Sequence, residues 1–237
     1  MWITVDAASL RYGDISRLTM YLQEGQTQWH ANDEQGRTIS LPLAVKLHDF
    51  HIEEYEPTIA ITDKKSLKII GKPTFIGDSL QVKKQKIRIL TYWPAAFFYG
   101  DEYRPNNQPG ACHAAYVMFA DSLQGWFASG SYMQQCRMLI VDNNTAIVML
   151  KPTPKKYSSH ITVYTREKDV VETTLEVNKP FGIRGWKLYQ SGYDESKGVW
   201  SSLSIISIVN DPWLPVVYVD AFMLIAGAVC MFWTGKK

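Results

Sequence analysis

The feature that most constrains this chain is an almost unbroken apolar run near its C-terminus. Residues 214–233 read LPVVYVDAFMLIAGAVCMFW and are followed by TGKK. At 1.5 Å per helical residue the run is roughly 30 Å long, which matches the hydrocarbon thickness of a bilayer. Trp213, Tyr218 and Trp233 stand toward its ends, where aromatic rings favour the headgroup level. We therefore predict a transmembrane helix over residues 213–234.

One ionisable residue, Asp220, lies within this run, about 5 Å from its midpoint. The run holds nine Leu, Ile, Val or Phe residues, whose combined contribution to membrane insertion is about −3 to −5 kcal/mol. A carboxylate at this depth costs about +2.5 to +3.5 kcal/mol. The insertion free energy is therefore close to zero, and we expect neighbouring helices to hold this one. Asp220 would bond such a helix or line a functional cavity.

Residues 1–212 precede the helix and are enough for one substantial domain or two small ones. We predict one domain, because the patterning is alike along the whole stretch. The formal net charge is only +2, and the short basic clusters at 82–86 and 151–156 suit solvated strand edges and turns, so we expect no nucleic-acid binding. Eight Trp and thirteen Tyr are typical of β-proteins with large contacts between strands.

Apolar residues recur with a period of two, which predicts strands. Leu41, Leu43, Val45 and Leu47 alternate with less apolar residues, and the phase slips at Asp49, where a β-bulge would explain it. Further predicted strands comprise residues 86–91 and three hairpins, formed by 138–141 with 146–150, 161–165 with 170–177, and 186–193 with 199–209.

Helical periodicity is weak outside the apolar run. Residues 13–23 and 112–128 are candidate short helices, and RPNNQPG at 104–110 is a loop. The predicted architecture is an all-β sandwich or open barrel, followed by one C-terminal transmembrane α-helix and a cytoplasmic tail at 235–237.

Few residues suggest explicit chemistry. His48 and His51 would lie on opposite faces of a regular strand, but a bulge would bring them to one face as candidate metal or haem ligands. Otherwise they are solvent-facing polar residues. Cys112 and Cys136 would form a disulfide in an oxidising compartment or remain free thiols, and both possibilities stay open. His113 follows Cys112, but no third group is evident to orient a Cys/His nucleophile.

The sequence also lacks a CxxC pair, a GxSxG or HExxH motif and a Walker loop, so we predict no catalytic residues.

The basic tail should stay cytoplasmic, with Asp211 on the other side of the membrane. Residues 1–212 would then lie outside the cytoplasm, yet the chain begins without an apolar signal-peptide core. Either upstream membrane helices are encoded elsewhere or cut away, or a tail-anchored domain faces the cytosol.

Two stretches together show a family pattern. One is ISLPLAVKLHDFHIEEY at residues 39–55, and the other is LEVNKPFGIRGWKLYQSGYD at 175–194, followed after a short strand by NDPWLPVVY and the apolar run. This resembles the ResB (CcsB) family of System II cytochrome c biogenesis. The positions of its second motif are occupied by Val177, Asn178, Pro180, Gly185, Tyr189, Gln190, Ser191, Tyr193 and Asp194.

The third family motif, which opens the last membrane helix, is matched by Asp211, Pro212, Pro215, Val217 and Tyr218. Trp213 replaces the usual small residue, and Asp220 stands where the family pattern has a small or apolar one. The three membrane helices that precede the domain in the family do not occur in residues 1–212. Such upstream helices would carry the domain across the membrane.

The resemblance implies an accessory factor of cytochrome c maturation, not an enzyme. It would work with a tryptophan-rich, CcsA-like membrane partner that handles haem, and would help to attach haem to apocytochrome c. The domain would face the periplasm from the bacterial inner membrane. The residues of the second motif would either build the sheet or contact haem, the partner or apocytochrome. The alternative function is a membrane-anchored β-domain that binds an extracellular ligand or protein, without haem; a tail-anchored cytosolic enzyme is a third reading.

Overall fold

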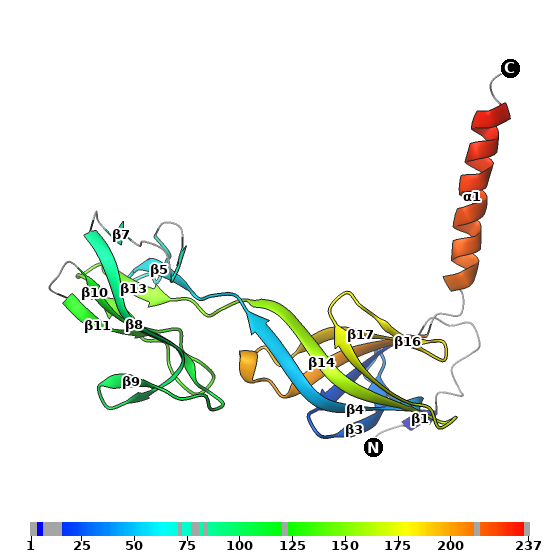
Figure 1. The fold of residues 1–237 in the computed structure, drawn as a ribbon, viewed down its shortest axis with the longest axis horizontal. Coiled ribbons are helices and arrows are strands. Elements are labelled where there is room, and N and C mark those ends of the chain that lie inside the picture. The colour runs from blue at the N-terminus through cyan, green and yellow to red at the C-terminus, as the bar shows by residue number, and fades with distance from the viewer. Residues whose placement is uncertain are drawn as a thin grey trace. The chain divides into compact units, whose positions relative to one another are not determined.

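The computed structural model of the chain (Figure 1) describes residues 4–6, 16–70, 73–76, 81–82, 85–119, 123–210 and 214–234. It divides into two compact units. Unit 1 comprises Met1–Phe50, Ser158–Tyr193 and Ser202–Lys237, and unit 2 comprises His51–Tyr157 and Asp194–Ser201. Sequence patterning predicted a single domain over residues 1–212, because apolar and polar residues alternate in the same way in both units.

Unit 1 contains a nine-stranded, nearly closed, barrel-like sheet. Its strand order is β15-β14-β4-β3-β2-β18-β17-β16, and β1 pairs in parallel with β4. The strands are β1 (Thr4–Asp6), β2 (Ser16–Gln23), β3 (Thr27–Asn32), β4 (Thr38–Glu54), β14 (Pro154–Thr165), β15 (Val170–Glu176), β16 (Phe181–Ile183), β17 (Trp186–Tyr193) and β18 (Leu203–Asn210). The last residues of β4 and the first of β14 belong to unit 2.

Alternating burial along β4 explains how this sheet forms. Odd-numbered apolar residues from Ile39 to Leu47 are buried, and the alternation then slips, because His48 and Asp49 are both exposed while Phe50 is buried. The slip falls where the sequence predicted it. Because side chains on a strand point to alternate faces, one extra residue shifts the buried face from odd-numbered to even-numbered residues in the rest of the strand.

An arginine joins the two terminal strands of the unit 1 sheet. The turn between β16 and β17 has two residues with positive φ, Arg184 at 49° and Gly185 at 82°, as the favoured two-residue hairpin turn requires. The Arg184 guanidinium lies 2.8 Å from Asp169 and 2.9 Å from Glu167, both in the turn between β14 and β15. These exposed ion pairs are individually weak, but they connect the tips of hairpins at opposite ends of the strand order.

Unit 2 has two sheets. One has the order β11-β10-β8-β7 with β9 on β8, and the other has the order β12-β13-β5-β6. The strands are β5 (Thr58–Asp63), β6 (Thr74–Phe75), β7 (Gln81–Val82), β8 (Gln85–Tyr99), β9 (Glu102–Pro105), β10 (Cys112–Phe119), β11 (Leu123–Ala128), β12 (Leu139–Ile140) and β13 (Thr145–Met149).

The core of unit 2 takes side chains from both sheets. Val117, Phe119 and Phe127 come from the larger sheet and pack with Ile59 and Ile147 of the smaller one. A short 3-10 helix, Gly198–Trp200, also belongs to this unit, and its Trp200 indole N–H donates to the Ala111 carbonyl at 2.9 Å. Unit 2 is therefore a two-layer β-structure with a shared apolar interior.

The only α-helix in the described residues is α1 (Leu214–Thr234). Its segment Val216–Trp233 has a mean hydropathy of 2.0, is entirely exposed, and is long and apolar enough to cross a membrane. Asp220 lies on this helix. The motif residues Asp211 and Pro212 and the tail at 235–237 lie outside the described residues.

The predicted fold class, an all-β extramembrane part with one C-terminal membrane-length helix, is confirmed. The predicted hairpins appear as β12–β13, β14–β15 and β17–β18, although β18 begins four residues later than expected. The short helices were wrong: the described parts of 13–23 and 112–128 form β2, β10 and β11. In β10 the helix-favouring Ala114 and Ala115 pair with strands on both sides, and this tertiary pairing outweighs local propensity.

Replacing Phe127 should test the unit 2 core. Its side chain is fully buried between the sheets, so Phe127→Ala should lower the free energy of unfolding by about 3–5 kcal/mol through lost contacts and a cavity. Phe75→Ala is the matched control, because Phe75 is 49% exposed and should cost far less. Denaturant unfolding followed by circular dichroism gives both values, and equal losses would contradict this description of the core.

Candidate functional site

The first residues of the second family motif form a tight turn after β15. Lys179 donates its backbone N–H to the Glu176 carbonyl at 3.1 Å, and the two residues form an isolated bridge. Asn178 has a φ of 64°, a left-handed conformation that Asn tolerates better than most residues. Pro180 then leads into β16. The geometry accounts for Asn178 and Pro180 as turn residues.

Gln190 of β17 lies at the centre of a buried polar network within unit 1. Its side-chain oxygen accepts a hydrogen bond from the Ser159 hydroxyl at 2.6 Å, and its amide nitrogen donates to the Ser204 hydroxyl at 3.1 Å and to the Gly192 carbonyl at 3.0 Å. The hydroxyls of Ser159 and Ser204 are 2.7 Å apart. All three side chains are buried, and each has hydrogen-bond partners, as buried polar groups require.

Ser191 marks a bulge in the ladder between β17 and β18. Gln190 pairs with Ile206 and Gly192 with Ile205, so Ser191 is the additional residue. Its hydroxyl donates to the Ser207 hydroxyl at 2.7 Å, and Tyr189 pairs with Ser207 in the register. Gln190 is buried in phase with Trp186 and Leu188, and Ser191, the additional residue, is exposed.

The motif ends in two residues with separate roles. The Tyr193 ring lies 5.8 Å from the Phe50 ring within unit 1. Asp194 begins the unit 2 segment 194–201, where its carboxylate accepts hydrogen bonds from the Ser196 hydroxyl at 2.5 Å and the Ser196 backbone N–H at 3.1 Å. The hydroxyl bond is the largest influence on this carboxyl and lowers its pKa. Asp194 thus caps the turn that follows the motif.

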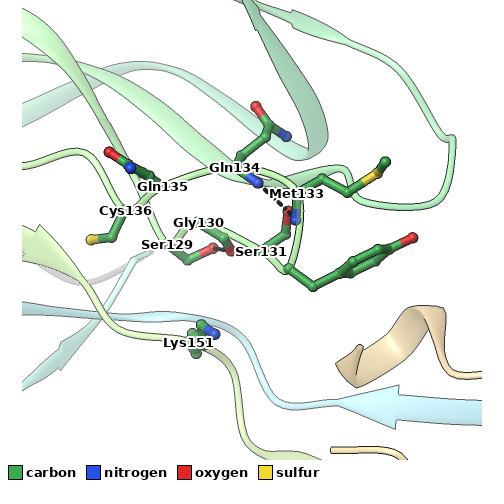
Figure 2. Close-up of a pocket in the computed structure, with 9 residues that line it drawn as sticks. Ser129, Gly130, Ser131, Met133, Gln134, Gln135, Cys136 and Lys151 are labelled. Atoms are coloured by element: carbon green, nitrogen blue, oxygen red, sulfur yellow. Dashed lines mark hydrogen bonds between the residues drawn. The ribbon is translucent and has the colours of Figure 1, made fainter. Parts of the chain in front are cut away.

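Two pockets in unit 2 share Lys151 and are called here the Lys151 pockets. The first has a volume of about 390 Å³ and lies between Lys151 and the loop 129–136, as Figure 2 shows. The second, of about 340 Å³, lies among Tyr55, Phe75 and Lys151. Lys151 is exposed in the connection between β13 and β14, as expected for a basic residue of a solvated turn.

The model of the ResB-like family matches residues 118–207 of the chain. The resemblance to the ResB-like family is confirmed. The ResB-like segment includes Lys151, the loop 129–136 and the motif from Asn178 to Asp194. The family is associated with cytochrome c biogenesis and is a family of assembly factors, not of known enzymes. No curated protein matches the chain.

The two candidate ligand histidines have different surroundings. His48 Nε2 lies 2.7 Å from the Thr162 hydroxyl, and its ring lies 5.3 Å from that of His160, all within unit 1. His51 is an exposed residue of unit 2. Throughout the part of the chain that the structure describes, no group of three or more His, Cys, Asp or Glu side chains is placed to hold a metal ion.

The two cysteines that precede α1 are free, with Cys112 buried and Cys136 exposed. Ala128 pairs with Ala114 on one side and with Arg137 on the other, so the strand ending at Ala128 runs between the two cysteine-bearing segments. Burial raises the pKa of Cys112 to about 11.

Sequence reasoning missed a hydrogen-bonded cluster around His113. Its Nδ1 lies 2.7 Å from the Tyr92 hydroxyl, the two rings are stacked, and its Nε2 lies 3.6 Å from the Glu54 carboxylate. The residues of this cluster come from three strands, β4, β8 and β10, so no short sequence motif could predict it. His113 is therefore oriented by Tyr92 and Glu54, and adjacent strand residues such as Cys112 point to the other face.

The Tyr92 phenol gives a prediction for alkaline pH. Burial raises the pKa of Tyr92 to about 12, and Glu56 and Glu54 add to the rise by repelling the phenolate. The unfolded phenol ionises near pH 10. Tyr92 therefore contributes stability below about pH 10 that is lost as the pH rises toward 12. The stability advantage of the wild type over Tyr92→Phe should shrink across this range in denaturant titrations, and a constant difference would contradict it.

Gln190 gives a second prediction. Gln190→Ala removes the central partner of two buried hydroxyls, so the free energy of unfolding should fall by about 1–3 kcal/mol. Ser191→Ala is the control, because Ser191 is an exposed residue whose hydroxyl makes a single part-buried bond to Ser207, and its loss should cost less than that of Gln190, about 1 kcal/mol. Denaturant unfolding compares the free energies of unfolding of the two variants with that of the wild type. A Gln190→Ala chain as stable as the wild type would contradict a structural role for this motif residue.

Proposed function

We propose that this chain is a membrane-anchored accessory factor of cytochrome c maturation. It works with a CcsA-like membrane protein that delivers haem and attaches it to apocytochrome c. The observation that supports this most directly is the ResB-like match over residues 118–207, which contains most of the motif that the sequence pointed to. The chain acts as an assembly factor, and its own side chains catalyse no step.

The membrane helix sets where this factor works. α1 is long and apolar enough to anchor the chain, and every side of Val216–Trp233 is exposed within the chain itself. We place the anchor in the bacterial inner membrane and both β-units on the periplasmic side, where c-type haem attachment takes place in the family. Haem passes through the complex as cargo.

Asp220 provides the contact with the partner in this proposal. Its carboxylate lies on α1 about 7 Å from the middle of Val216–Trp233, too deep for a short side chain to reach the headgroups. An isolated intramembrane acid costs several kcal/mol, and a hydrogen-bond donor on a neighbouring helix offsets that cost. The marginal insertion free energy of α1 agrees with a helix that is held by a partner.

The alternative function is a membrane-anchored β-domain that binds an extracellular ligand without haem. The exposed aromatic side chains around the Lys151 pockets favour it, because grouped apolar surface marks interaction sites. Unlike the first proposal, this one requires no change in c-type cytochromes when the protein is removed.

A deletion with complementation tests the proposed function. Removing the gene from its host should abolish covalently bound c-type haem on stained gels and leave b-type cytochromes unchanged. Wild-type protein should restore the signal. Asp220→Ala should reduce the co-purified CcsA-like partner about threefold or more, because interhelical hydrogen bonds are worth about 0.6–1.7 kcal/mol. Asp220→Asn, which keeps hydrogen-bonding capacity, should retain more of it.

Cys230→Ala is the control on the same helix, since Cys230 is also exposed on α1 and should be dispensable. Fully haemylated c-type cytochromes in the deletion strain would refute the proposed function. Normal partner recovery with Asp220→Ala would refute the role of Asp220 alone.

A further inference from the structure

The turn that follows β5 in unit 2 exposes apolar side chains among lysines. Residues 64–70 read KKSLKII. The side chains of Leu67, Ile69 and Ile70 are 60%, 47% and 51% exposed, and the lysines at positions 64, 65 and 68 are exposed as well. Residues 63–70 are called here the Leu67 turn. Large aliphatic side chains that lie together on a surface mark a site of interaction.

The Leu67 turn is held in one conformation by Asp63. The Asp63 carboxylate accepts hydrogen bonds from the backbone N–H groups of Lys65 and Ser66 at 3.0 and 2.7 Å, and the Asp63 carbonyl accepts the Leu67 N–H at 2.8 Å. Leu67 has a φ of 54°, a left-handed conformation that costs a leucine energy and that the surrounding bonds maintain. The turn is therefore ordered before it meets a partner, so that binding loses little conformational entropy.

The apolar surface of the turn continues onto the smaller sheet of unit 2. Ile69 is paired with Thr62, and Thr62 with Ala146. Ala146 is paired in turn with Ile140, which is 49% exposed. Directly opposed residues share a face of a sheet, and this face points away from the core, because the neighbouring residue Ile147 lies in the core. The Thr62 hydroxyl donates to the Ala146 carbonyl at 3.3 Å, so the one polar side chain of this row is satisfied.

The charge around the Leu67 turn is positive. None of its three lysines forms an ion pair with a residue that the structure describes. Two acids adjoin the turn: Asp63 within it, and Asp142 in the β12–β13 hairpin, whose Asn144 carbonyl accepts the Lys64 N–H at 2.9 Å. Both carboxylates accept backbone N–H groups of their own turns. The three ammonium groups are therefore available to an anionic surface.

We infer that the Leu67 turn docks on the surface of a bilayer that contains anionic lipids. The side chains of Leu67, Ile69 and Ile70 enter the headgroup region, and the lysines beside them bind lipid phosphates. The inference goes beyond the proposed function and does not depend on a role in cytochrome c maturation.

The composition of the turn favours a lipid surface over a protein partner. Lysine is depleted in protein interfaces, whose binding energy comes mainly from Trp, Tyr and Arg, and residues 64–70 contain none of these three. Lysines beside aliphatic side chains are instead typical of segments that lie in a membrane interface. The membrane-length helix α1 adds a second argument, because a chain that is anchored by α1 needs only weak further contacts to dock on the same bilayer.

A fluorescent label on the turn of the full chain, reconstituted in lipid nanodiscs, tests this inference. An environment-sensitive fluorophore is attached to Leu67→Cys in a chain whose exposed cysteines, Cys136 and Cys230, are replaced by Ser; Cys112 is buried. In discs of phosphatidylcholine with phosphatidylglycerol, the emission should shift to the blue and be quenched by lipids that carry a nitroxide on an acyl chain. In discs of phosphatidylcholine alone, the ratio of docked to free turn should be at least about tenfold lower, because each lysine contributes about fivefold near an anionic surface.

Charge substitutions separate the role of the turn from that of overall charge. Replacing the lysines at positions 64, 65 and 68 together by Gln should lower docking on anionic discs by about tenfold or more, and added salt should act in the same direction. The matched control removes three positive charges from exposed positions of unit 2 outside the turn, through Arg88→Gln, Arg104→Gln and Lys155→Gln, and should dock as the unsubstituted chain does.

A second label position controls for general contact with the disc. Asp101 is exposed in the turn between β8 and β9, which lies apart from β5 within unit 2 (Figure 1), so a label on Asp101→Cys should stay in water in every disc. Circular dichroism verifies folding, and Ile70→Cys carries the label if Leu67→Cys does not fold. A label on the turn that stays in water on anionic discs would overturn the inference. Equal docking with and without phosphatidylglycerol, or shielding that requires an added protein, would overturn it too.

Discussion

Three buried hydrogen-bonding side chains connect distant parts of the chain in unit 1. Ser159, Gln190 and Ser204 belong to β14, β17 and β18, and their bonds lie inside a nearly closed sheet where water cannot replace them. Satisfied networks of this kind fix one arrangement of strands, because any slip in register leaves a buried polar atom without a partner. The bulge at Ser191 follows Gln190 directly, and the ladder between β17 and β18 continues beyond it.

Much of the fold was predictable because the sequence alternates so regularly. The hairpins and the phase slip at Asp49 all follow from a period of two, and the membrane helix follows from length and hydropathy. The errors have a physical cause as well. The segment that became β10 contains Ala114 and Ala115, which favour helix locally, and only pairing with β8 and β11 makes it a strand. A single sequence does not reveal such pairing.

The site was less predictable than the fold. The motif from Asn178 to Asp194 was identified from the resemblance, but the left-handed turn at Asn178 and the inward Gln190 are visible only in the structure. The Lys151 pockets were missed because their parts, near residues 55, 75, 130 and 151, are far apart in sequence. The cluster around His113 was missed for the same reason, because Glu54, Tyr92 and His113 are far apart in the sequence.

The division of the chain into units also bears on how the protein is made. Unit 2 is almost one continuous stretch, His51–Tyr157, inserted into unit 1, which resumes only afterwards. During synthesis from the N-terminus, most of unit 2 is complete while unit 1 still lacks five of its nine strands. Strands β2, β3 and β4 can pair with one another early, but β4 lacks its neighbour β14, and β2 lacks its neighbour β18 until β18 emerges just before the membrane helix. The membrane anchor is thus made immediately after the last strand that closes unit 1, so assembly of the sheet and membrane insertion are consecutive events.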